Sequence, residues 1–412
     1  MDIDDTPEEA AFRAEARAWL DAHAVPKGGP DDFSAGFWSG TYDEAAYVAE
    51  CRRWQRTLYD GGWAGITWPK QFGGRGGRPI ESAIFNQEQA RFGVSTGVFM
   101  IAVGMVGPTI IAHGTPEQQE QFLPGMLRGE DLWCQLFSEP DAGSDLAGLT
   151  TRAERDGDEW VVTGQKVWTS SAPRAKWGIL LARSDWDVPK HKGITYFLVD
   201  MATPGITIRP LRQMTGESHF CEVFLDGVRI PAANVLGQPG EGWRIAQTTL
   251  MSERSSIAGG GGSTPEPGAL VDLARRCGRT DDPRVRQTLA RVHTQAALLR
   301  FLRYRTQTAL SQGRPPGQEA SVMKLAHSRY MRDLTRAAID LQGAAGQLDN
   351  ADGTEGAQDM WLRRFLHAPS LGIAGGSDQV QANIIGERAL GLPPEPREDR
   401  DTPFRQALRS RN

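Results

Sequence analysis

The chain contains little cysteine: four cysteines in 412 residues, with no C-x-x-C pair among them. This spacing excludes a disulfide framework and offers no zinc-ligand cluster, so we expect a reducing compartment and no metal site. No apolar run approaches the roughly 20 residues that a membrane-spanning helix needs, and the acidic start MDIDDTPEEA lacks the apolar stretch of a secretory signal. We therefore expect a cytoplasmic protein without a membrane span.

Several motifs that would define other functions are also missing. The sequence has no G-x-x-x-x-G-K-[ST] loop, no complete G-x-G-x-x-G between a strand and a helix, no H-E-x-x-H and no G-x-S-x-G. These absences disfavour kinase, Rossmann-type and hydrolase functions. The net charge of −5 argues against a general nucleic-acid binder, so we expect no nucleic-acid partner, although a local basic patch could hold a phosphorylated ligand.

Helix start signals occur twice in the first third of the chain. Thr6, followed by Pro7 and Glu9, has the spacing of a capping box, and Thr115 with Gln118 repeats it. After the first signal, apolar residues recur at helical spacing. The pattern predicts an amphipathic helix at each position.

The pattern changes twice along the chain, and a chain of this length is expected to form more than one core. The pattern of residues 1–131 predicts helices. Residues 132–238 contain short β-rich runs separated by turn residues, which predict a small barrel or sandwich. Residues 239–412 contain long helical patterns, which predict an antiparallel bundle. We therefore expect an α+β multidomain protein with these three domains.

Two polar motifs stand out from this plan. FSEPDAGSDLAGL, at residues 137–149, mixes hydroxyl groups with small residues, as a wall lying close to a flat polar ligand requires. GQKVWTSSA, at residues 164–172, places an aromatic residue beside three hydroxyl residues. Taken singly, each motif would fit an ordinary turn, or a strand with a core tryptophan.

In this order and spacing, the two motifs resemble the acyl-CoA dehydrogenase family. The resemblance covers nearly the whole chain and includes HGTPEQQEQFLPGMLRGE, FLDGVRIPAANVLGQPGEGW and GGSDQVQANIIGERALGLP. It implies a helical N-terminal domain, a middle β-barrel and a C-terminal four-helix bundle. It also implies FAD as cofactor, bound without a Rossmann fold.

The family resemblance implies a reaction as well. A glutamate removes the α-proton of an acyl-CoA thioester while the β-hydrogen leaves as hydride to flavin N5, which yields a trans-2-enoyl-CoA. Electrons usually pass onward to electron-transfer flavoprotein, so this protein is an expected partner.

Matching the family motifs assigns roles to individual residues. The expected substrate residues are Ser144, at the junction of FAD and acyl-CoA, with Arg254, Gly375 and Gly376. Ser170 replaces the more frequent threonine near flavin N5 and keeps its hydroxyl group. The expected cofactor-binding residues are Phe137, Ser138, Ser144, Trp168, Thr169, Ser170, Ser377 and Gln379.

The expected catalytic base is Glu253. Many family members carry the base directly before the glycine of a late E-G-T-S segment, but this sequence reads AGGSDQ and has Gly375 at that place. A smaller branch, which includes isovaleryl-CoA and long-chain enzymes, carries it in a pattern like L-E-R-x-x-x-A-G-G. SERSSIAGG fits that pattern and aligns Glu253 with the base and Arg254 with the arginine. Such a base needs a dry pocket within reach of the α-proton. The alternative is an ordinary solvated Glu253–Arg254 pair.

The sequence departs from homotetrameric relatives where they hold FAD across a subunit interface. The R-x-x-F-G segment lacks its Phe-Gly, and DLQGAAGQL has Asp340 and Ala344 in place of a glutamine and a glycine. Similar losses occur in α2β2 heterotetrameric members, so we expect the base-carrying subunit of such an assembly. The alternatives are a homo-oligomer with rearranged contacts, a non-catalytic partner subunit, a flavin acyl-CoA oxidase, or a family member acting on a non-CoA substrate.

The acyl group is indicated only by small residues. The glycines at 259–262 and 375–376 suggest a roomy pocket for branched, long or ring-bearing chains. The Ala-, Arg- and Gly-rich composition resembles that of actinobacteria, where heteromeric relatives act on steroid side chains. We therefore expect a role in fatty-acid or steroid side-chain β-oxidation.

Overall fold

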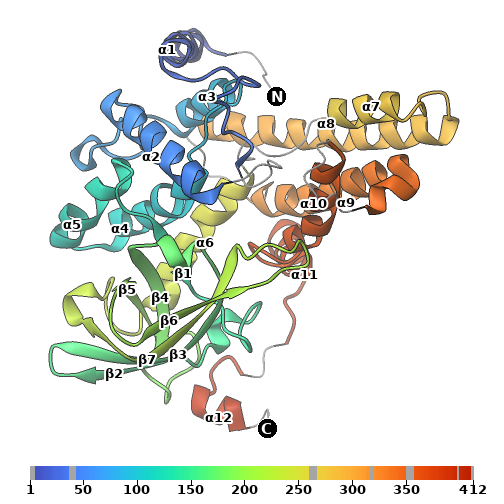
Figure 1. Ribbon diagram of the computed structural model, residues 1–412. Helices are drawn as coiled ribbons and strands as arrows, with labels where there is room; N and C mark the ends of the chain where they lie inside the picture. The colour runs from blue at the N-terminus through green and yellow to red at the C-terminus, as the bar shows by residue number, and fades with distance from the viewer. Residues whose placement is uncertain are drawn as a thin grey trace. The chain divides into compact units, whose positions relative to one another are not determined.

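The computed structural model describes residues 5–36, 43–258, 267–312, 314, 317, 319–348, 357–396 and 399–409 (Figure 1). The chain divides into two compact units. The first comprises Met1–Thr57, Arg75–Gly97 and Arg254–Pro393, and the second comprises Leu58–Gly74, Val98–Glu253 and Pro394–Asn412. None of the helices in the described part of the chain combines the length and the apolar character that a membrane crossing requires.

The α-helices within these residues are α1 (Pro7–His23), α2 (Glu44–Asp60), α3 (Pro79–Gln89), α4 (Gly107–His113), α5 (Pro116–Leu127), α6 (Gly242–Ala258), α7 (Pro267–Arg276), α8 (Pro283–Ser311), α9 (Glu319–Gln342), α10 (Ala357–Leu371), α11 (Asp378–Ile384) and α12 (Phe404–Arg409). The strands are β1 (Trp133–Leu136), β2 (Arg152–Asp156), β3 (Glu159–Ser170), β4 (Trp177–Arg183), β5 (Ile194–Asp200), β6 (Ile206–Leu211) and β7 (Phe220–Pro231).

Helix α1 begins at the predicted capping box. Thr6 Oγ1 accepts the N–H of Glu9 at 3.2 Å, and Glu9 Oε2 accepts the N–H of Thr6 at 3.0 Å, so the box is complete. The same reciprocal pair forms at the start of α5. Two of the orphan N–H groups of each helix are thereby satisfied. Both predicted helix starts are confirmed.

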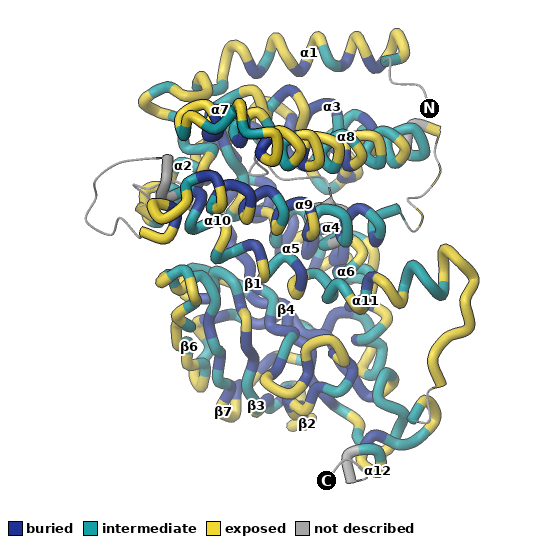
Figure 2. Tube along the Cα trace, turned by 90° about the vertical axis from the view of Figure 1, so that its right-hand side faces the viewer, coloured by how far each residue is buried: buried dark blue, intermediate teal, exposed yellow. Residues whose placement is uncertain are grey.

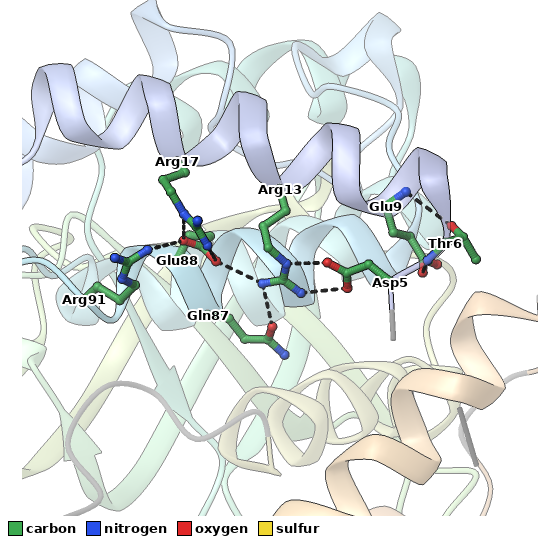
Figure 3. A network of polar contacts seen from close by, with 8 residues as sticks. All are labelled: Asp5, Thr6, Glu9, Arg13, Arg17, Gln87, Glu88 and Arg91. Carbon is green, nitrogen blue, oxygen red and sulfur yellow. Dashed lines mark hydrogen bonds and ion pairs between the residues drawn. The ribbon is translucent and has the colours of Figure 1, made fainter. Parts of the chain in front are cut away.

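An arginine cluster ties α1 to α3 in the first unit. Glu88 on α3 is 5% exposed and accepts hydrogen bonds from Arg13, Arg17 and Arg91 (Figure 3). Burial opposes ionisation of Glu88, but the three guanidinium groups outweigh it and hold its pKa at about 2. Helix α1 thus carries both the two arginines that bind Glu88 and an apolar side on which Phe12 is buried.

The C-terminal helices of the first unit share one apolar core. Helices α7, α8, α9 and α10 contribute to it, with Leu273, Val292, Leu334 and Trp361 among its buried members. Figure 2 shows that α9 carries much of this buried surface. The predicted C-terminal helical bundle is confirmed, and α11 packs beside α9.

The second unit is built around one curled seven-stranded sheet (Figure 1). The path of hydrogen-bonded strands runs β1-β4-β2-β3-β7-β6, and β5 pairs antiparallel with β4. Strands β4 and β5 are buried along nearly their whole length, which explains their continuous apolar sequences. A core of buried residues lines the sheet, including Leu136, Leu180, Phe197 and Val223. The predicted middle β region is confirmed.

Candidate active site

A buried ion pair joins the two polar motifs in the second unit. Lys166 on β3 is fully buried and donates from Nζ to Glu139 Oε1 at 2.7 Å and to the carbonyl oxygen of Phe137 at 3.1 Å. The same carboxylate accepts the backbone N–H groups of Thr150 at 2.6 Å and Thr151 at 2.9 Å. Burial opposes ionisation of Glu139, but Lys166 and these hydrogen bonds hold its pKa below the ordinary value. Glu139 and Lys166 together therefore connect the Phe137–Glu139 segment, strand β3 and the backbone at Thr150 and Thr151.

Strand β3 changes register directly after this lysine. The ladder to β7 shifts between Lys166 and Thr169, and Trp168 within that step has a φ of 62°. A bulky residue rarely adopts this left-handed conformation. The Trp168 side chain is 59% exposed and meets Phe220 edge to face, with ring centroids 5.9 Å apart. A strained backbone that presents a large aromatic ring to solvent is typical of a binding site.

The residues after Trp168 provide hydroxyl groups. Thr169 is buried, and its Oγ1 has no hydrogen-bond partner in the part of the chain that the structure describes. An unsatisfied buried hydroxyl costs about 1–3 kcal/mol. Ser170 is half-buried, and Ser171 is left-handed with a φ of 59°. An exposed ring beside an unpaired hydroxyl fits a flat ligand with polar atoms at its edge.

A buried arginine, Arg183, holds the loop that carries Ser144 by hydrogen bonds to its backbone. Ser144 itself is exposed. Arg183 is fully buried at the end of β4 and donates to the carbonyl oxygens of Ala147 at 2.7 Å and Leu149 at 3.0 Å. Burial lowers the pKa of Arg183 to about 10, which leaves the guanidinium charged at neutral pH. The loop conformation thus depends on a side chain 34 residues away along the sequence.

Three buried hydroxyl groups connect α6 to α4 and β5. Thr249 Oγ1 lies 3.0 Å from Thr109 Oγ1 and 3.1 Å from Tyr196 Oη. Thr109 donates its single hydroxyl proton to the carbonyl oxygen of Met105 at 2.8 Å. Thr249 must therefore donate to Thr109, and Tyr196 to Thr249, because each hydroxyl has one proton. Burial raises the pKa of Tyr196 and keeps that phenol protonated.

Glu253 lies one helical turn beyond Thr249. Residues four apart share a side of a helix, so Ile245, Thr249 and Glu253 face the same way. The first two are fully buried, and Glu253 is half-buried. The Tyr196 ring that holds Thr249 packs edge to face against Phe137, with centroids 5.8 Å apart. One continuous set of contacts therefore connects the Phe137 segment to the helix that carries Glu253.

The late glycine-rich segment belongs to the first unit. Gly375 and Gly376 have φ values of 64° and 83°, so both occupy the left-handed region that favours glycine. Ser377 caps α11 by accepting the N–H of Val380 at 3.2 Å, and Gln379 is exposed. A residue with a Cβ at position 375 would be strained, which fits the glycine that the sequence has there.

Helix α9 anchors this segment. The carboxylate of Asp378 accepts hydrogen bonds from Ser328 at 2.7 Å, Arg332 at 2.6 Å and Lys324 at 3.3 Å. The hydrogen bonds from Ser328 and Lys324 outweigh the effect of burial and lower the pKa of Asp378. The segment beside the two glycines is thereby fixed at one point in the first unit.

The predicted site residues thus fall into two groups. The second unit holds Glu253 and the residues of the two polar motifs, which are Phe137, Ser138, Ser144, Trp168, Thr169 and Ser170. The first unit holds Gly375, Gly376, Ser377 and Gln379. The side chain of Arg254 and the glycines at 259–262 lie outside the described residues.

Reasoning from the sequence did not find Glu139, Lys166 or Arg183. The only available signal was that Arg183 ends the apolar strand WGILLAR, where a charge is expected to be costly unless it is paired or hydrogen-bonded. Their partners lie far away along the chain, so no local pattern reveals them.

Three family models match consecutive parts of the chain. They are the acyl-CoA dehydrogenase N-terminal domain over residues 6–130, the middle domain over 134–228 and the C-terminal domain over 240–390. The acyl-CoA dehydrogenase IpdE1 of Mycolicibacterium smegmatis is 41% identical over 399 residues, which cover 93% of this chain and 98% of that protein. The chain belongs to the acyl-CoA dehydrogenase family. The predicted fold class and enzyme class are confirmed.

Other relatives in the family are similar over different lengths. Acyl-CoA dehydrogenase FadE34 of Mycobacterium tuberculosis is 44% identical over 351 residues, which cover 85% of this chain and 47% of FadE34. The chain therefore spans about half the length of that relative.

Two solved structures of the family share the fold. The steroid ACAD Tcur3481-Tcur3483 has a TM-score of 0.81 and 30% identity, covering 96% of this chain and 100% of that chain. The ChsE4-ChsE5 complex from Mycobacterium tuberculosis has a TM-score of 0.76 and 28% identity, covering 96% and 100% respectively.

Proposed function

We propose that the chain catalyses FAD-dependent α,β-dehydrogenation of an acyl-CoA thioester to a trans-2-enoyl-CoA, with Glu253 as the base. The observation that carries the proposal is the contact path from Phe137 through Tyr196 and Thr249 to the side of α6 on which Glu253 lies. This path supports a carboxylate held in a defined place relative to the expected flavin-contacting segment. Family membership supplies the class of reaction.

The residues at the end of β3 suit the cofactor. The exposed Trp168 ring offers a flat apolar surface, and the Thr169 hydroxyl, which has no partner among the described residues, offers a hydrogen bond. Together with Ser170 and the segment Phe137–Ser138 they would hold the flavin ring, and Ser377 and Gln379 would contribute on the pyrophosphate side. FAD, when bound, accepts the β-hydrogen of the substrate as hydride.

The chain's own residues supply the rest of the reaction. The Glu253 carboxylate would take the α-proton, and a double bond would form between the α and β carbons as the β-hydrogen leaves. Ser144, Arg254, Gly375 and Gly376 would bind the acyl-CoA. Because the α-proton of a thioester is weakly acidic, the carboxylate must be desolvated and within hydrogen-bond reach.

The test is Glu253→Gln, which keeps the shape of the side chain and removes its basicity. We expect dehydrogenation to fall by at least about a thousandfold while the flavin spectrum stays unchanged; general-base catalysis alone contributes roughly a hundred- to ten-thousandfold. Glu241→Gln is the matched control, because Glu241 precedes the same helix and pairs with Arg244 at the surface. Full activity in Glu253→Gln would reject Glu253 as the base.

The same assay separates the competing functions. A non-catalytic partner subunit would show the same activity with and without Glu253 whenever a sister chain is present. Oxygen consumption equal to substrate turnover would identify an oxidase, whereas transfer to electron-transfer flavoprotein supports the dehydrogenase. Activity without a CoA thioester would indicate another substrate class.

We further propose that the chain assembles with a sister acyl-CoA dehydrogenase subunit as an α2β2 heterotetramer. The ChsE4-ChsE5 complex supports this, since its fold matches over nearly the whole chain. Expressed alone, the chain should be colourless or smaller than a tetramer. A yellow homotetramer with one flavin per subunit would reject the heteromer.

For the acyl group we propose a steroid-bearing or other bulky chain, supported by the likeness to the steroid ACAD Tcur3481-Tcur3483. The expected result is a higher kcat/KM for a CoA thioester with a fused-ring acyl group than for a straight-chain thioester. The reverse order would reject this substrate class.

A further inference from the structure

The loop that carries Ser144 is connected to a distant segment near the end of the described chain. Arg183 holds the loop by two of its carbonyl oxygens and also donates to the carbonyl oxygen of Lys190 at 3.0 Å. These three acceptors are neutral carbonyls, and the carboxylates of Glu139, Asp145 and Asp185 favour the charge without overcoming the effect of burial. The guanidinium therefore depends on what covers it.

Phe404 provides that cover. The guanidinium carbon of Arg183 lies 3.5 Å from the centroid of the Phe404 ring and 5.8 Å from that of Trp186. Phe404 is 2% exposed, and its ring centroid is 5.7 Å from that of Trp186. A cation over an aromatic face is stabilised more strongly when water is excluded. The aromatic pair thus keeps Arg183 dry and directed at the loop.

Residues 399–405 reach this position by pairing with the chain after β4. The N–H of Phe404 donates to the carbonyl oxygen of Val188 at 2.9 Å, and that of Arg405 to Trp186 at 2.9 Å. Arg405 also binds Asp187 at 2.8 Å. The segment is therefore docked by backbone hydrogen bonds in addition to its aromatic anchor.

A second link runs from the same segment to the loop itself. Lys190 Nζ lies 3.1 Å from both carboxylate oxygens of Asp145, the residue after Ser144, and 2.9 Å from Asp399 Oδ2. The Lys190 side chain is only 14% exposed, so this ion triad is partly shielded from solvent. Lys190 thus contacts the loop at Asp145, whereas Arg183, covered by Phe404, contacts it at Ala147 and Leu149.

We propose that residues 399–405 are a positioning element for the Ser144 loop, acting through Phe404 on Arg183 and through Asp399 on Lys190. Their part in substrate binding rests on the proposed function, in which Ser144 contacts FAD and acyl-CoA. Loosening the loop lowers the population of its binding-competent form, and the apparent affinity falls by the same factor. The effect is on binding and leaves the base untouched.

The first measurement is hydrogen exchange in the unliganded protein as purified, with its partner where it has one. The N–H groups of Gly148 and Leu149 report on the loop, because they donate within it to Asp145 at 2.8 Å and Leu146 at 3.1 Å. Phe404→Ala should speed their exchange about tenfold, while amides in the β6–β7 ladder stay unchanged. Phe404→Tyr keeps the aromatic cover and should restore the slow exchange.

Asp399→Asn is the second variant, because it removes only the charge of a half-buried side chain and should keep the fold even if Phe404→Ala does not. It should speed loop exchange about threefold. Asp156→Asn is its matched control, because it breaks a surface ion pair with Arg229 on the same sheet without touching the loop. Loop exchange equal to that of the unaltered protein in both Phe404→Ala and Asp399→Asn overturns the proposal, whatever the activity.

The second measurement is the steady-state rate with acyl-CoA. We expect Phe404→Ala to raise KM about tenfold with kcat within about twofold of the unaltered protein. Faster loop exchange with an unchanged KM would keep residues 399–405 as the element that orders the loop, and would reject the assignment of Ser144 to the substrate. The two failures are thereby distinguished.

Discussion

Each unit contains a buried carboxylate, Glu139 in the second unit and Glu88 in the first, and the two charges are neutralised in different ways. Among the described residues, one cation hydrogen-bonds to Glu139, namely Lys166, and the other hydrogen bonds come from backbone N–H groups and a threonine hydroxyl. Glu88 has three cationic partners, Arg13, Arg17 and Arg91 (Figure 3). A single cation makes the first arrangement sensitive to one substitution, whereas three arginines make the second redundant.

The positions of the two carboxylates give this difference a consequence. Glu139 fixes the backbone around the candidate cofactor residues, where displacement by an ångström would disturb binding. Glu88 joins two helices, where any one of several contacts maintains the packing. The three arginines around Glu88 therefore stabilise the packing of two helices. The single hydrogen-bonded cation at Glu139 instead sets the position of the backbone around the candidate cofactor residues.

The largest expected effect comes from removing the single cation. Lys166→Met leaves the buried Glu139 charge without its hydrogen-bonded cation, which should lower the free energy of unfolding by about 3–5 kcal/mol. Denaturant unfolding measures the loss. Arg91→Gln, which removes one of three cations around Glu88, should cost less than about 1 kcal/mol. Equal losses in the two variants would show that the two arrangements do not differ.

A smaller effect is expected from neutralising Glu88, and it depends on pH. The pKa of Glu88 is held at about 2, below that of the unfolded chain, so its contribution is complete above the unfolded pKa and is lost as the pH falls toward 2. Glu88→Gln should therefore cost about 3 kcal/mol at pH 7, from the size of this shift. The gap between the two proteins should close between about pH 5 and pH 2 when unfolding midpoints are compared. A gap independent of pH would mean that shape, not charge, holds α1 on α3.

The smallest expected effect has the opposite sign. Thr169→Val replaces a buried hydroxyl that has no partner in the described residues, so the cofactor-free protein should gain about 1 kcal/mol of stability. If the hydroxyl serves the cofactor, the same change should weaken FAD binding several-fold in a flavin titration. Thr163→Val is the control, because Thr163 is exposed on the same strand. Unchanged FAD affinity would remove Thr169 from the cofactor site.

Local structure was largely predictable from the sequence. The capping boxes at Thr6 and Thr115 form as their spacing predicts, because each needs only residues within one helical turn. The helical spacing of apolar residues predicted one buried side of the first helix, and the structure buries Phe12, Ala16 and Leu20 and half-buries Trp19. The spacing of apolar residues predicted which side of the helix is buried, but not how deeply each residue on that side is buried.

The candidate site was predictable only as a set of motifs. Resemblance to the family assigned roles to Trp168 and Glu253, and these roles remain proposals. The left-handed backbone of Trp168 could not be predicted, since it results from the register shift between β3 and β7. The tie between Thr249 and Tyr196 likewise joins residues 53 apart in sequence.

The sequence by itself determined the helical and β-rich regions, the helix starts and the family, because these depend on neighbouring residues or on motif order. The tertiary structure alone decided that Lys166 meets Glu139, that Arg183 holds the Ser144 loop and that Phe404 covers Arg183. The physical reason is that a buried charge is stable only with partners that surround it from several directions. Those partners come from strands, loops and a distant segment that only folding brings together.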